Sequence, residues 1–149
     1  MTAESSSPLT FSDAGSVSIG YASDLYELLH AIDETMPKTA ILYLEGTSIA
    51  PDVRTFLESR RAEHPREVAR GTVYPATSTF HLPLNDQNLT ELRALADLHA
   101  EPEICDHLAV YRDGELLLTA YDAGDGEVDV AKSLPDAVIQ ELRHALSIH

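Results

Sequence analysis

The chain has 149 residues, of which 44% are hydrophobic, a balance that favours one domain with a buried core and excludes wholesale disorder. Ten basic residues against 25 acidic ones give a formal charge of −15, which repels DNA and RNA, so we expect no nucleic-acid partner. One cysteine excludes an intramolecular disulfide, and the lack of a long apolar run or a secretion signal favours a cytoplasmic protein that makes no contact with a membrane.

The sequence of the N-terminal part of the chain predicts a tail, followed by a strand and a helix. Residues 1–16 are rich in Ser and Thr and poor in apolar side chains, so we expect a mobile tail, pinned at most by Phe11. A single α/β domain is expected over residues 17–149, beginning with a short strand at residues 17–21. Ser23 can cap a helix whose apolar side chains recur every three or four positions until a proline ends it.

A continuous apolar run at residues 40–44 is the main guide to the architecture. It predicts a strand that is buried on both faces and therefore central in a sheet. Helices on either side would cover those faces, so the expected fold class is α/β, a three-layer sandwich with about four helices. Pro51 suits the first turn of a second helix, which His64-Pro65 would stop.

Weaker signals occupy the middle of the chain. Residues 68–74 have the β-branched and aromatic character of a strand, but Gly71 and Pro75 make that strand short or peripheral. Residues 79–82 are a second extended candidate, after which Asn85-Asp86 can cap a third helix.

The clearest local signal is a β-hairpin over residues 107–121. Two apolar runs flank an Asp113-Gly114 turn, a pair that favours the tight turns of hairpins. Residues 122–127 are expected to form an acidic loop, and Ser133 can cap a terminal helix.

This order of elements resembles the thioredoxin-like fold. Residues 107–117 look like the hairpin that follows the proline loop of that fold, and residues 40–44 look like its central strand. Two departures remove the family's chemistry: residues 50–53 read Ala-Pro-Asp-Val in place of Cys-x-x-Cys, and Asp106 stands at the proline position. The resemblance therefore implies a redox-inactive binding or scaffolding protein, and a generic α/β sandwich remains an alternative.

Two short segments hold the candidate ligand-binding residues. Glu45, Thr47 and Ser48 follow a buried strand and precede a helix, where α/β folds often bind ligands. Cys105 and His107 are two positions apart and could share one face of a strand, as a nucleophile and its base would. An ordinary strand-to-helix turn explains the first segment more simply, and a buried thiol beside a histidine satisfied by the main chain explains the second more simply.

Metal and catalytic sites have little support in the sequence. Zinc could in principle collect Cys105 and His107 with His81 or His99, but no paired ligand spacing is present. We therefore expect no catalytic residue, no metal and no cofactor.

An acidic segment near the C-terminus is the candidate partner-binding site. Its members are Asp122, Asp125, Glu127 and Asp129. Their field would accelerate association with a basic protein, although such acidity also serves solubility alone, and the segment lacks the pattern of an EF-hand. The first hypothesis is accordingly a non-catalytic interaction or regulatory module. A small-ligand-binding protein comes second, and a minor enzyme third.

Overall fold

The computed structural model describes residues 8–22, 24–68, 77–123 and 126–147. One sheet of six strands, in the order β1-β6-β5-β4-β2-β3, is antiparallel at every pair of neighbours. The strands are β1 (Ser16–Tyr21), β2 (Ile41–Gly46), β3 (Ser78–Pro83), β4 (His107–Arg112), β5 (Glu115–Tyr121) and β6 (Glu127–Ala131). The helices of the described residues are α1 (Leu25–Thr35), α2 (Pro51–Ser59), α3 (Asp86–Leu98) and α4 (Asp136–Ser147), with a 3-10 turn at Glu101–Glu103.

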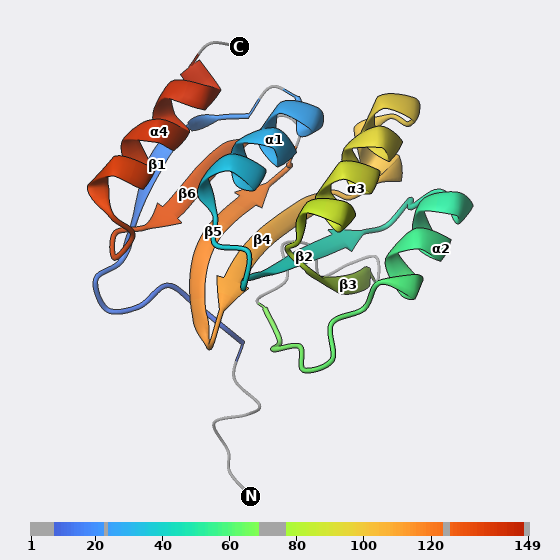
Figure 1. The fold of residues 1–149 in the computed structure, drawn as a ribbon, viewed down its shortest axis with the longest axis horizontal. Coiled ribbons are helices and arrows are strands. Elements are labelled where there is room, and N and C mark those ends of the chain that lie inside the picture. The colour runs from blue at the N-terminus through green and yellow to red at the C-terminus, as the bar shows by residue number, and fades with distance from the viewer. Residues whose placement is uncertain (1–7, 23, 69–76, 124–125, 148–149) are drawn as a thin grey trace, which may run out of the picture.

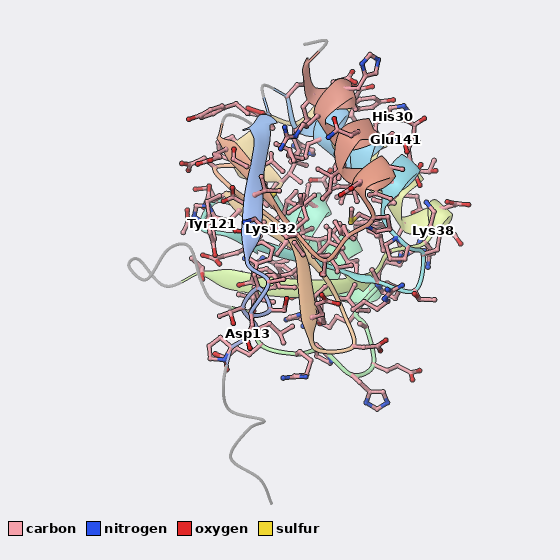
Figure 2. The ribbon with its side chains drawn as sticks, turned by 90° about the vertical axis from the view of Figure 1, so that its left-hand side faces the viewer. Asp13, His30, Lys38, Tyr121, Lys132 and Glu141 are labelled. Carbon is pink, nitrogen blue, oxygen red and sulfur yellow. The ribbon has the colours of Figure 1, made fainter. Side chains whose placement is uncertain are left out.

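All four helices lie on one face of the sheet, in front of it in Figure 1 and beside it in the turned view of Figure 2. Their apolar side chains join those of all six strands in one core cluster, to which β2 contributes Leu42 and Leu44. The described residues contain no second helical layer, so the expected three-layer sandwich is corrected to a sheet with helices on one side. A thioredoxin-like topology is not shown either, because that fold has a mixed sheet.

The central position expected for residues 40–44 is confirmed, because β2 pairs with β3 on one side and β4 on the other. Its second face is buried without helices. Tyr43 packs in a smaller cluster with Leu9 and Val68, which also form an isolated parallel bridge with each other. A continuous apolar run therefore marks a strand covered on both faces, whatever kind of structure provides the cover.

Local signals located the starts of α2 and α3 correctly, whereas α4 begins at Asp136 and not directly after the expected cap Ser133. Asn85 accepts a hydrogen bond from the Asn88 main-chain N–H at 2.8 Å, as expected of the cap of α3. Pro51 opens α2, where its missing N–H costs nothing. Asp24 is the cap of α1, one residue beyond the expected Ser23.

The hairpin of β4 and β5 is confirmed in its strands and its turn. Asp113 and Gly114 both have positive φ, 54° and 88°, as a type I′ turn requires. β6 then pairs with β5, although the sequence predicted no strand after the acidic loop expected at residues 122–127. Only five residues form β6, of which Val128 and Val130 face the helices, so the alternating pattern is short.

Two edge features complete the sheet. The pairing of β1 with β6 shifts register between Ser18 and Gly20, which is a β-bulge. At the other edge, the Ala62 main-chain N–H donates to the His81 carbonyl of β3 at 2.7 Å.

No described helix has the length and apolar character needed to cross a membrane.

Part of the predicted tail is packed against the sheet. Leu9 is buried, and its main-chain N–H donates to the Glu67 carbonyl at 2.8 Å. Phe11 packs against the same small cluster, as the sequence suggested. Of the strand expected at residues 68–74, the positions after Val68 lie outside the described residues, as does Asp125.

Candidate functional site: the open face of the sheet

The sheet face opposite the helices, here called the open face, gathers several candidate residues into one row. Strand register places Tyr21 opposite Glu127, Tyr121 opposite His107, and His107 opposite Glu45. Residues that the sequence assigned to a ligand site and to a partner site therefore lie on the same face. The link between them is β5, which carries Tyr121.

A second row runs parallel to the first. Its members, one from each strand, are Ser18, Asp129, Thr119, Ala109, Tyr43 and His81. Side chains that alternate along a strand point to opposite faces, so this row shares the open face with the first. The open face is thus largely polar, whereas the residues between these rows enter the helix-side core.

The exposed fraction of the side chains in the first row falls from β1 towards β2. The side of β1 and β6 is open, with Tyr21 70% exposed, while Tyr121 on β5 is 41% exposed. Towards β4 and β2 the same face closes, because His107 is 8% exposed and Glu45 is fully buried. In this row a partner can therefore reach Tyr21 and Tyr121, but not His107 or Glu45.

Tyr121 lies in a negative field. Burial raises the pKa of its phenol above the ordinary value, and the carboxylates of Glu45 and Asp129 raise that pKa further. Burial also raises the pKa of Asp129, with Glu127 adding to the shift. Around Tyr121 the surface therefore favours cations and disfavours anions.

His107 is held in place by the turn that follows β5. Its Nδ1 accepts a hydrogen bond of 2.9 Å from the Asp122 main-chain N–H, so in the neutral ring the proton resides on Nε2. Its ring meets the Tyr121 ring edge-on at 5.4 Å between centroids. Asp122 has a positive φ of 59°, and its contribution here comes from the main chain.

Glu45 is a fully buried carboxylate with a defined hydrogen-bond donor. The Tyr43 hydroxyl, two residues earlier on the same face of β2, donates to Glu45 Oε1 at 2.9 Å. Buried carboxylates need such donors, because removal from water strongly disfavours an unpaired charge. A ligand therefore cannot reach Glu45 without a change in the structure around it.

Thr47 and Ser48 are exposed in the turn after β2, where a ligand could reach them. The main-chain N–H and the hydroxyl of Thr47, however, both donate to Asp106 Oδ2, each at 3.0 Å. The chain's own carboxylate thus occupies the position in which those donors would hold an anion.

Cys105 does not share a face with His107. It packs in the helix-side core, because β4 begins only at His107 and the strand alternation does not extend back to residue 105. Burial, followed by Asp106 and Glu101, raises the pKa of the thiol far above its usual range. A thiol that stays protonated and enclosed is a poor nucleophile.

The described residues contain no group of three or more His, Cys, Asp or Glu side chains arranged to hold a metal ion. Sequence reasoning missed Tyr21 as a member of the open face, since the bulge in β1 changes which side chains face outward.

No protein-family model, no curated protein and no solved structure matches this chain.

Proposed function

We propose that the protein is a non-catalytic interaction module whose open face over β1, β6 and β5 binds a basic segment of a protein partner. The observation that carries the proposal is the position of Tyr21 and Tyr121, two of the large apolar side chains most exposed among the described residues. They lie on the strands either side of β6, which presents Glu127 and Asp129 on the same face.

The chemistry of this surface suits arginine and lysine side chains. A guanidinium attracts the face of an aromatic ring and pairs with carboxylates, and both kinds of group are present here. Tyrosine is also enriched at protein interfaces, because a large rigid ring loses little entropy on binding. Solubility alone would explain the acidic side chains, but it does not explain two exposed tyrosines beside them.

The alternative, a small-ligand pocket near residues 45–48 and 105–107, has weaker support. The donors of Thr47 already hold Asp106, and Glu45 and Cys105 are buried on opposite sides of the sheet. We propose in addition that the protein is redox-inactive, since its lone thiol is enclosed in the core.

A nona-arginine peptide, with binding followed by biolayer interferometry, tests the proposed surface. The double variant Glu127→Gln, Asp129→Asn should slow association several-fold at low salt, because two charges at the docking surface are removed. Its matched control is Glu34→Gln, Glu141→Gln, which makes the same charge change on the helix side; Glu141 is labelled in Figure 2. Equal slowing by both variants would mean that the peptide binds a diffuse field, and the proposal would fail.

The tyrosines provide a second, independent measurement. Replacement of Tyr21 and Tyr121 by serine should accelerate dissociation of the same peptide while leaving the net charge unchanged. Leu98→Ser on α3 is the control, because Leu98 is an exposed apolar residue outside the open face. Unchanged dissociation from the tyrosine variant would remove the aromatic part of the proposal.

A further inference from the structure

A pocket of about 470 Å³ lies at the end of the sheet where β4 turns into β5. One wall comes from the sheet, with Ile41, Pro83 and Tyr111, and the other from the connection between α2 and β3. That volume falls within the range of small-molecule sites, about 300–1,000 Å³, and the sheet wall supplies the apolar surface that such sites need.

Hydrogen bonds and an isolated β-bridge hold the α2–β3 connection, which forms this wall, against the rest of the fold. Ala62 donates its main-chain N–H to the His81 carbonyl, and Arg66 donates its own to the Tyr111 hydroxyl at 2.9 Å. The Tyr111 hydroxyl lies 2.9 Å from His81 Nδ1, to which it can donate in turn. Two residues beyond Arg66, Val68 forms its bridge with Leu9. The pocket is therefore preformed at this wall.

Two arginines, Arg66 and Arg112, line the pocket. Neither Arg66 nor Arg112 forms an ion pair within the part of the chain that the structure describes, in contrast to Arg60 with Glu91 at 2.9 Å and Arg93 with Asp33. In a chain with 25 acidic residues against 10 basic ones, two arginines that line one pocket and form no ion pair with any described residue are candidates to hold an anionic ligand.

The absence of a side chain in the β4–β5 turn leaves room for one of these arginines. A Cβ added to Gly114 would lie only 3.0 Å from Arg66 Nη1, so the guanidinium rests against the turn. Gly114 also has a φ of +88°, which glycine adopts without strain. Arg66 therefore lies against the turn that follows Arg112, the last residue of β4.

The acidic side chains of the pocket define how a ligand is recognised. Glu63 and Asp113 also line it, so the formal charges of the two arginines are balanced there. With the overall charge of −15, long-range attraction does not draw anions to this site. An anion bound here would therefore be recognised by direct, bidentate contacts from guanidinium groups, together with apolar contact along the sheet wall.

We propose that this pocket binds a small organic anion, a carboxylate or phosphate monoester joined to an apolar group. The proposal is independent of the proposed function, because it concerns the other end of the sheet and a ligand of opposite charge. His64 also lines the pocket and can add a further hydrogen bond to the ligand.

The test uses phenyl phosphate and benzoate as anionic probes, with phenol and benzylamine as neutral and cationic controls. Amide resonances of Ala62 and Gly114, at two sides of the pocket, should shift with at least one anion at concentrations up to about 10 mM. The stronger of the two anions identifies the preferred class, phosphate or carboxylate. Phenol and benzylamine should bind at least about tenfold more weakly.

Variants assign the binding to the two arginines. Arg66→Gln, Arg112→Gln should weaken binding by about tenfold or more, whereas the charge-matched control Lys132→Gln, Arg143→Gln should change it less than about twofold. Arg66→Lys keeps the charge but loses the planar fork, so its affinity should fall between the two. An unchanged far-UV circular dichroism spectrum establishes that each variant folds.

Three results would overturn the proposal. The first is the absence of any shift at Ala62 and Gly114 with both anions, and the second is phenol binding as tightly as phenyl phosphate. The third is an equal loss of affinity in the arginine variant and in its Lys132 and Arg143 control.

Discussion

The two faces of the sheet differ in how they are covered and in what they contain. The face towards the helices joins α1, α2, α3 and α4 to all six strands in one apolar cluster. The open face has a smaller apolar cluster around Tyr43 and Tyr111, and its polar residues and the rings of Tyr21 and Tyr121 become exposed towards β1. The same strands thus provide the stability of the fold on one side and leave the other side available for binding.

The largest expected effect comes from a cavity in the helix-side core. Leu44→Ala removes a fully buried side chain from β2 and should lower the free energy of unfolding by about 2–5 kcal/mol. Ser18→Ala on the exposed part of the open face should change it by less than about 0.5 kcal/mol. Urea unfolding measures both, and similar losses would contradict the distinction between the faces.

The buried polar group of the open face should have an intermediate effect. Tyr43→Phe removes the donor to Glu45 Oε1 and should lower the free energy of unfolding by about 1–3 kcal/mol. Tyr121→Phe is the control, since that hydroxyl belongs to a half-exposed side chain and its loss should change stability little. If the two variants unfold at the same urea concentration, the Tyr43 hydrogen bond contributes nothing to stability.

His81, which contacts Tyr43 and Tyr111 on the covered part of the open face, should make the fold sensitive to acid. Burial, with a smaller contribution from Arg61, lowers the pKa of His81 from 6.5 to about 4. The unfolded chain therefore binds more protons between these values, and the stability present above pH 6.5 is lost as pH falls towards 4. His81→Gln should flatten this part of a stability–pH curve measured by urea unfolding.

His99, which caps the C-terminus of α3 on the helix side, should give a smaller effect of opposite sign. Hydrogen bonds to Asp52 and Glu103 raise the pKa of His99 above its usual value of 6.5. The stability that protonated His99 adds to the fold is fully present below pH 6.5 and is lost as pH rises through the raised pKa. His99→Gln should remove that loss on the alkaline side, and an unaltered curve there would show that the ion pairs are screened by solvent.

Sequence patterns predicted the helix-side core well, because periodic apolar residues and caps are local signals. The stripe of α1, the cap at Asn85 and the Asp113-Gly114 turn each depend on neighbours within a few positions. The missing second helical layer had no such signal, since the residues covering Tyr43 include Leu9 and Val68, which are distant in sequence from each other.

The open face was only partly predictable for the same reason. Glu127 and Asp129 were recognised by their charge, but their strand was not, and their association with Glu45 and His107 depends on pairing across β5 and β4. Register between distant strands follows from tertiary packing, which a single sequence does not reveal. Placement of Cys105 in the core similarly depends on where β4 begins.

The bulge in β1 has a consequence for aggregation. An open sheet has two edge strands, whose unpaired main-chain groups can template the addition of strands from other molecules. At the β3 edge, the Ala62 main-chain N–H donates a hydrogen bond to the His81 carbonyl. At the β1 edge, the bulge between Ser18 and Gly20 breaks the regular pattern of strand hydrogen bonds, and Gly20 has a φ of +128°. A straightened β1 would present a longer regular edge, so we expect the bulge in β1 and the hydrogen bond at the β3 edge to reduce strand addition between copies of the chain.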